Sequence, residues 1–136
     1  MFQGLHHVAL IVSDYARSRH FYVDLLGLAV VGEHYRSERN SWKLDLQLPD
    51  GKLLEVFSFP SPPARHSYPE ACGLRHLAFA VTDLDACRQQ LQARGVLLEA
   101  VRTEPLSGYR FCFFADPDGL PLEIYEIQKP ADSASK

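Results

Sequence analysis

The sequence predicts an α+β fold built from two tandem βαβββ modules. Two internal repeats carry this prediction. Residues 5–14 (LHHVALIVSD) recur as residues 74–83 (LRHLAFAVTD), at an offset of 69 positions from 7 to 76. Residues 49–59 (PDGKLLEVFSF) recur as residues 117–127 (PDGLPLEIYEI), at an offset of 68 positions from 55 to 123. Each copy also holds one stretch of helical periodicity and four strand-like stretches, so the chain consists of two copies of one module.

In the first module, residues 5–12 are rich in Val, Ile and Leu and predict a half-buried strand. Asp14 is a suitable N-cap for the helix that follows, and Gly27 suits the left-handed position at its end. The expected apolar face of this helix consists of Tyr15, Ser18, Phe21, Tyr22, Leu25 and Leu26. Three more strands are expected near 28–35, 41–48 and 52–59, and the Pro49-Asp50-Gly51 turn separates the last two.

The second module repeats this order. A strand over 74–81 leads through Asp83 into a helix over 84–94, which ends at Gly95. The remaining strands are expected near 96–102, 109–115 and 120–127, with a matching Asp-Pro-Asp-Gly turn at 116–119.

The predicted organisation is a single domain over residues 1–128. Module one spans about 5–59 and module two about 74–127, and a Pro-rich linker at 60–73 joins them. Residues 129–136 have the composition of a flexible tail.

The composition is that of an ordinary globular domain. With 46% hydrophobic residues among 136, the chain is not a disordered one, and its net charge of -3 provides no basic field for nucleic acid. No apolar run approaches the roughly 18 residues of a membrane helix, and the N-terminus lacks a cationic leader. The three cysteines show no CxxC spacing, which predicts reduced thiols in the cytoplasm rather than a disulfide framework or a zinc ribbon.

Four polar residues interrupt the apolar strands at repeated positions. His7 and His76 occupy the same place in the first strand of each module, and Glu55 and Glu123 the same place in the last. A carboxylate in such a strand costs several kcal/mol unless it is paired or coordinates a cation. Taken alone, a histidine or glutamate in a strand is more often a core or surface residue than a metal ligand. A pseudo-twofold axis between the modules, however, would bring all four side chains together. Two imidazoles and two carboxylates suit a divalent transition metal such as nickel, zinc, manganese or iron.

Other polar and aromatic residues give weaker signals. Phe57, Phe59 and Tyr125 share the strand face of the two glutamates and are candidate pocket residues, with core packing as the alternative. His6 lies on the opposite face of the strand from His7, and we expect it either to have a structural role or to support His7 as a ligand. The basic residues that could bind an anionic substrate are individually more consistent with solvated surface; they are Arg36, Arg39, Lys43, Arg75, Arg102 and Arg110.

The motifs LHHVALIVSD, FYVDLLGL, LRHLAF and DPDGLPLEIYE resemble those of the vicinal oxygen chelate superfamily. This superfamily includes glyoxalase I, extradiol dioxygenases, methylmalonyl-CoA epimerase, and the fosfomycin- and bleomycin-resistance proteins. The resemblance covers residues 5–127 and implies a cupped mixed sheet around one metal ion. Glyoxalase I is the most similar member because it uses a carboxylate from both modules. By that resemblance the metal ligands are His7, Glu55, His76 and Glu123, with nickel or zinc favoured and manganese, cobalt or iron as alternatives.

The same resemblance implies a metal-dependent lyase or isomerase that acts as a cytoplasmic homodimer on a small α-oxygenated substrate. Proton transfer would pass through a metal-chelated enediolate, with Glu123 as the base and Glu55 as the second candidate. Glyoxalase I commonly has Arg and Asn, which serve glutathione binding, where this chain has Ile11 and Phe59. Apolar side chains cannot bind a glutathione carboxylate in that way, so a glutathione hemithioacetal is one candidate substrate among several.

Two groups of alternatives stay open at the level of sequence. One is another reaction on the same scaffold: an epimerase, a fosfomycin-type resistance transferase or a ring-cleaving dioxygenase. The other is a non-catalytic ligand-binding protein.

Overall fold

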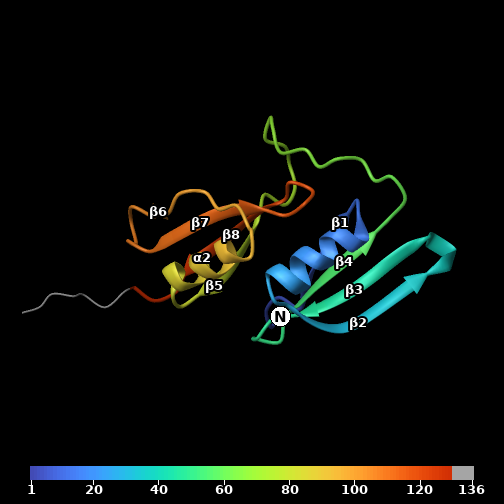
Figure 1. The fold of residues 1–136 in the computed structure, drawn as a ribbon, viewed down its shortest axis with the longest axis horizontal. Coiled ribbons are helices and arrows are strands. Elements are labelled where there is room, and N and C mark those ends of the chain that lie inside the picture. Colours follow the sequence, from blue (N-terminus) through green and yellow to red (C-terminus); the bar gives the residue numbers. More distant parts are fainter. Residues whose placement is uncertain (130–136) are drawn as a thin grey trace, which may run out of the picture. The chain divides into compact units, whose positions relative to one another are not determined.

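The computed structural model describes residues 1–129. The chain divides into two compact units, one ending at Arg65 and the next beginning at His66. Each unit contains one of the two expected βαβββ modules (Figure 1). The tail expected at 129–136 lies outside the described residues apart from Lys129.

The first unit holds a mixed four-stranded sheet in the order β1-β4-β3-β2. Its strands are β1 (His7–Val12), β2 (Ala29–Arg36), β3 (Ser41–Gln47) and β4 (Leu53–Ser58). Strand β1 runs parallel to β4, and the other neighbours are antiparallel. Its helical elements are α1 (Tyr15–Arg19), the π-helical η1 (His20–Leu25) and the 3-10 turn η2 (Ser37–Arg39).

The helical segment forms where its caps and apolar face predict it. The Asp14 side chain accepts a hydrogen bond from the N–H of Arg17, and Gly27 adopts a φ of 78° after the last turn. The expected α-helix is π-helical in its second half, although Phe21 and Tyr22 are buried as predicted. Alternate residues of the strands complete this core: Leu10, Val12, Leu44, Leu46, Leu54 and Val56.

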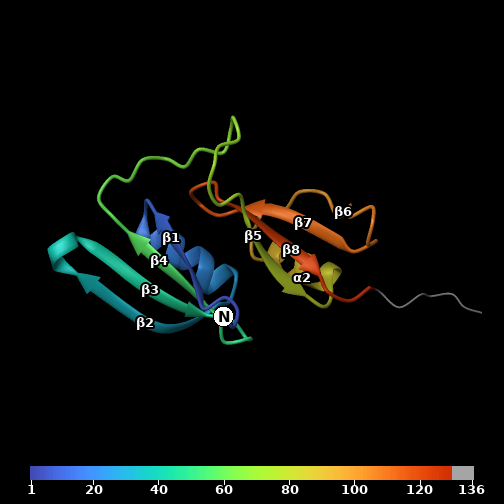
Figure 2. The same cartoon turned by 180° about the vertical axis from the view of Figure 1, so that it is seen from behind.

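The second unit repeats this topology, with strands in the order β5-β8-β7-β6 (Figure 2). Its elements are β5 (Leu77–Val81), α2 (Leu84–Ala93), β6 (Arg102–Thr103), β7 (Arg110–Ala115) and β8 (Pro121–Glu126). The Asp83 side chain caps α2 by accepting from the N–H of Ala86. The hydrogen-bonded strands therefore form two mixed sheets, one in each module, in an α+β fold.

The prediction of a strand near 96–102 is largely wrong, since only Arg102–Thr103 form a strand there, although the N–H of Glu99 also donates to the carbonyl of Phe113 in β7. The reason lies at the end of α2. The N–H of Val96 bonds back to the carbonyl of Leu91, so the start of the apolar run closes the helix instead of joining the sheet. Leu97 is then 90% exposed.

No helix among residues 1–129 is both long and apolar enough to cross a membrane.

Candidate metal centre

His7 and Glu55 form a pair on one face of the first sheet. Strands β1 and β4 are parallel, with Ala9 opposite Glu55, so the even spacing from His7 to Ala9 places His7 and Glu55 on the same face. The Nε2 atom of His7 lies 3.8 Å from Oε2 of Glu55. The Nδ1 atom of His7 lies 3.0 Å from Nδ1 of His6. In a hydrogen bond between these two nitrogens one donates and the other accepts. The contact orients the His7 ring so that Nε2 is directed at Glu55.

His76 and Glu123 form the equivalent pair in the second unit. His76 directly precedes β5, and Glu123 lies in the middle of β8, opposite Ala78. The Nε2 atom of His76 is 3.0 Å from Oε2 of Glu123. The imidazole edge packs against the ring of Phe113, with centroids 5.1 Å apart. Here the aromatic ring, and not a second histidine, orients the ligand candidate.

Glu123 is a buried carboxylate, only 5% exposed. This burial raises the pKa of Glu123, an effect that the nearby positive charges of His76 and Arg102 partly oppose. The carboxylate therefore occupies a position where a cation would stabilise its charged form.

Each unit brings together two side chains of metal-ligand type. Imidazole nitrogen and carboxylate oxygen are a mixed donor set that suits first-row divalent ions. Among residues 1–129, no group of three or more His, Cys, Asp or Glu side chains gathers around one point. The structure thus shows two half-sets of donors, and their union into one four-ligand centre stays a prediction.

The predicted pocket residues share the faces of the two glutamates. Phe57 follows Glu55 by two positions in β4 and stacks near Phe59, with ring centroids 6.4 Å apart. Tyr125 follows Glu123 by two positions in β8 and stacks on Phe111 at 5.6 Å. Ile11, opposite Phe57 in the sheet, is 60% exposed. Their role in lining a pocket stays a prediction.

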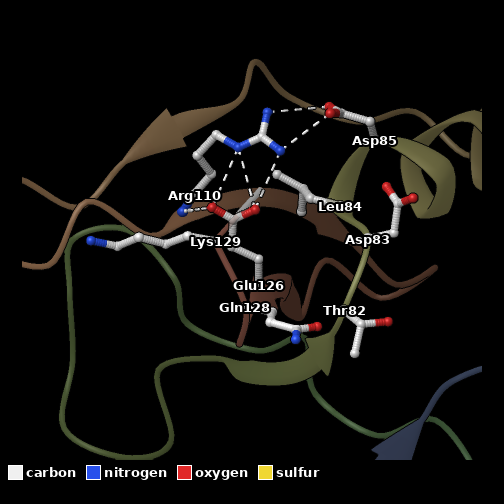
Figure 3. A pocket seen from close by; sticks show the side chains of 8 residues that line it. All are labelled: Thr82, Asp83, Leu84, Asp85, Arg110, Glu126, Gln128 and Lys129. Atoms are coloured by element: carbon white, nitrogen blue, oxygen red, sulfur yellow. Dashed lines mark hydrogen bonds and ion pairs between the residues drawn. The ribbon is translucent and has the colours of Figure 1, made fainter. Parts of the chain in front are cut away.

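The sequence reasoning missed a second charged cluster, on the core side of the second sheet (Figure 3). Glu126 is 1% exposed and accepts hydrogen bonds from the backbone N–H and the guanidinium of Arg110, which also pairs with Asp85. These residues line a hollow of about 510 Å³ together with the β5–α2 turn and Lys129. The signal was present in the sequence, because Glu126 shares the strand parity of the buried residues Leu122 and Ile124.

Comparison with known proteins gives a family match over most of the chain. The model of the Glyoxalase/Bleomycin resistance protein/Dioxygenase superfamily matches residues 4–124. The chain is 54% identical over 126 residues to uncharacterized protein YwkD of Bacillus subtilis (strain 168), covering 93% of this chain and 98% of that protein. It is 54% identical over 122 residues to uncharacterized protein YaeR of Escherichia coli (strain K12), covering 90% and 95%.

A solved structure and two proteins with named activities extend this comparison. The glyoxalase family protein from Enterococcus faecalis superposes with a TM-score of 0.86 at 46% identity, covering 92% of this chain and 98% of that one. The chain is 32% identical over 128 residues to glutathione transferase FosA of Serratia marcescens, covering 92% and 82%. It is 29% identical over 145 residues to 2-epi-5-epi-valiolone epimerase of an Actinomyces species, covering 91% and 79%.

Members of this superfamily typically bind a divalent metal ion and a small-molecule substrate, and they often form dimers. The duplicated topology seen here is the one that the resemblance to vicinal oxygen chelate proteins implied. Matched over nearly its whole length, the chain belongs to the glyoxalase/bleomycin resistance/dioxygenase superfamily.

Proposed function

We propose that this protein is a divalent-metal-dependent isomerase or lyase of the glyoxalase I type, which moves a proton between neighbouring carbons of a small α-oxygenated substrate. One observation carries the proposal. The same histidine–glutamate pair is built twice, at 3.8 Å in the first module and 3.0 Å in the second. Each pair places a carboxylate beside an imidazole on a strand face, which is costly to keep in both modules for packing alone, and a shared metal centre would require both pairs.

The donor chemistry fits a divalent cation. Glu123 is buried, and its ion-pair partner is an imidazole, which carries a charge only when protonated. A neutral imidazole is a good metal ligand, and a dication would balance the charge of both glutamates. His7, Glu55, His76 and Glu123 would hold the ion, with nickel or zinc preferred. The two pairs would meet either within one chain or between two chains of a homodimer.

The proposed reaction needs one group that accepts and returns a proton. A metal ion bound to these residues would act as a Lewis acid toward two neighbouring oxygens of the substrate. Glu123 would take the proton from the carbon beside a carbonyl and deliver it to the adjacent carbon, so that no net oxidation occurs. The burial of Glu123 favours it over Glu55, whose side chain is 15% exposed, because water competes less for the proton.

The location proposed for this reaction is the cytoplasm. Cys72, Cys87 and Cys112 are all free thiols, as a reducing compartment would keep them.

Glutathione transfer is the second candidate, and the 32% identity to glutathione transferase FosA favours it. Two residues on the site face of the first module count against glutathione as the substrate. Ile11 and Phe59 are apolar, where glyoxalase I commonly has side chains that bind the tripeptide.

The test is metal-dependent exchange of carbon-bound hydrogen in heavy water. The protein is loaded in turn with nickel, zinc, manganese, cobalt or iron(II) and mixed with methylglyoxal plus glutathione, or with simple α-hydroxyketones. Proton NMR then follows deuterium incorporation at the carbons beside the carbonyl. We expect incorporation that requires the metal and disappears in Glu123→Gln.

His20→Ala is the matched control. His20 also pairs with a carboxylate, that of Asp24 at 2.8 Å, but this pair is exposed on the helical segment. Its loss should leave exchange intact. Exchange that ignores the metal or survives Glu123→Gln would contradict the proposal, and consumption of glutathione without exchange would favour the second candidate.

A further inference from the structure

We propose that Arg36 binds an oxyanion of the substrate, a carboxylate or a phosphate, on the His7–Glu55 face of the first sheet. This inference rests on the proposed function for the rest of the substrate, an α-oxygenated small molecule. It adds that this molecule is anionic and names the residue that recognises the charge.

The fold places Arg36 on the correct face. Arg36 ends β2 opposite Ser41 of β3, and Lys43, two residues after Ser41, lies opposite Phe57. Because every second residue of a strand shares a face, Arg36 lies on the same side of the sheet as Phe57 and Glu55. The guanidinium carbon lies 4.9 Å from the ring centroid of Phe57 and 5.9 Å from that of Phe59.

The guanidinium is held in place before any ligand arrives. Two phenyl rings support it by cation–π contact, and its Nη2 donates a hydrogen bond to Oγ of Ser41 at 3.0 Å. Ser41 is fully buried. An arginine fixed in this way loses little further side-chain entropy when it binds, which is the condition for an effective recognition residue.

Arg36 is also incompletely satisfied. Two other cations of the first unit have carboxylate partners: Arg19 pairs with Glu33, and Lys43 with Asp45 at 2.6 Å. Within the described chain Arg36 has no carboxylate partner, and its buried Nε has no hydrogen-bond acceptor. A buried donor without an acceptor costs about 1–3 kcal/mol. A carboxylate or phosphate would bind through the remaining Nη donors, since the planar guanidinium presents several donors to such a group.

The second module also places an arginine beside a phenyl ring on its glutamate face, although not at the equivalent position: by strand register Arg102 corresponds to His34, and Phe113 to Asp45. Arg102 comes from β6, the strand equivalent to β2, and its guanidinium lies 5.4 Å from the ring centroid of Phe113. Arg102, however, pairs with Glu99 at 2.9 Å. Arg102 is thus neutralised by a carboxylate of its own chain, whereas Arg36, on the glutamate face of the first module, is left to bind a carboxylate or phosphate of the ligand.

The first arm of the experiment needs no metal. Protein labelled with ¹⁵N-arginine and treated with EDTA is titrated with sodium phosphate or sodium acetate at constant ionic strength. The Nε–H signal of Arg36 is assigned from its loss in Arg36→Lys. We expect a saturable shift of this signal with at least one anion, unchanged in Arg39→Gln, which removes the same charge from an exposed turn residue.

The second arm uses nickel-loaded protein and calorimetry with three probes that share a hydroxyketone. Dihydroxyacetone is neutral, hydroxypyruvate carries a carboxylate and dihydroxyacetone phosphate carries a phosphate. One of the two anions should bind at least roughly tenfold more tightly than dihydroxyacetone, the size of a charge-assisted hydrogen bond. This advantage should vanish in Arg36→Gln, shrink in Arg36→Lys and persist in Arg39→Gln. The tighter anion identifies the group recognised.

The two proposals fail separately. No saturable Nε shift with either anion, or equal losses in Arg36→Gln and Arg39→Gln, would overturn the role of Arg36 even if the protein binds nickel. A saturable shift in protein that binds no metal would uphold Arg36 and refute the proposed function.

Discussion

The two halves of the molecule carry the same donor pair but support it differently. In the first, His7 and Glu55 are 3.8 Å apart, with side chains 43% and 15% exposed. In the second, His76 and Glu123 are 3.0 Å apart, with side chains 31% and 7% exposed. His6 orients the first imidazole, whereas the ring of Phe113 packs against the second. The two modules thus share the same pair of candidate ligand types but differ in the residues around them. The pair of the second module is the more buried and has the shorter distance between its two side chains.

A second comparison concerns the core side of each sheet. The side chain of the last residue of β4 accepts from a strand N–H, as Ser58 Oγ does from Trp42 at 3.0 Å. The equivalent in the second module is Glu126, which accepts from the N–H of Arg110 at 2.6 Å. The second module has replaced a neutral hydroxyl by a buried carboxylate that needs the guanidinium as its counterion.

The largest expected effect is a difference in kcat between variants of the two glutamates, Glu123 and Glu55. If the more buried carboxylate, that of Glu123, is the base, Glu123→Gln should lower kcat by a factor on the order of 10²–10⁴, the range for loss of a general base. Glu55→Gln should lower kcat much less once metal is saturating. Steady-state kinetics at saturating nickel, with metal content measured on both variants, checks this. Equal losses of kcat would show that the difference in burial does not decide the roles.

The next effect concerns stability. Arg110→Ala leaves the carboxylate of Glu126 buried without its cation and should lower the free energy of unfolding by about 3 kcal/mol. Ser58→Ala removes one neutral hydrogen bond and should cost about 1 kcal/mol. Urea unfolding of both variants gives the two values. A cost for Ser58→Ala as large as that for Arg110→Ala would contradict this account of the divergence.

A smaller effect, on nickel affinity, is expected from the residues that precede His7 and His76, namely His6 and Arg75. His6→Ala removes the hydrogen-bond partner of His7 and should weaken nickel binding about tenfold or more. Arg75→Ala changes the equivalent residue of the second module, an exposed side chain paired with Glu70, and should leave nickel affinity unchanged. Competition with a metallochromic indicator measures both. The account of His7 fails here if the two variants behave alike.

The smallest effect is the pH dependence of one ion pair in the first module, that of Glu33 with Arg19. Hydrogen bonds from Arg19 and Tyr15 hold the pKa of Glu33 below its ordinary value of 4.5. Its contribution to stability is therefore complete above that value and is lost as the pH falls through the lower folded pKa. Glu33→Gln should cost less than about 1 kcal/mol at pH 7, because solvent screens the exposed pair. The difference in stability from wild type should narrow as the pH falls below 4.5, as urea midpoints at several pH values would show. A constant difference would argue against ionisation of Glu33 as its source.

Sequence reasoning reached the module topology because periodicity and caps are local signals. Asp14, Asp83 and Gly27 act where the pattern predicts them. The failure at 96–102 came from a tertiary preference, since burying Val96 behind α2 outweighs strand pairing. An apolar run alone does not say which neighbour will cover it.

The candidate donors were predictable because the same costly residue recurs at equivalent positions. The pairing within each module follows from register, which parallel strands β1 and β4 supply. The contacts of His6 and Arg36 were not predictable in this way, because side-chain contacts with Nδ1 of His7 and the ring of Phe57 leave no periodic trace. The strand parity of Glu126 indicates its burial but not its partner, the N–H of Arg110.

The most direct test of the central idea, that two half-sets of donors form one metal centre, is the metal stoichiometry of half-site variants. Mass spectrometry would measure bound nickel and zinc in dialysed wild-type protein, in His7→Ala/Glu55→Ala and in His76→Ala/Glu123→Ala. The account predicts about one ion per chain in the wild type and almost none in either double variant. An ion that persists after one pair is removed would contradict it, as would two independent ions per chain.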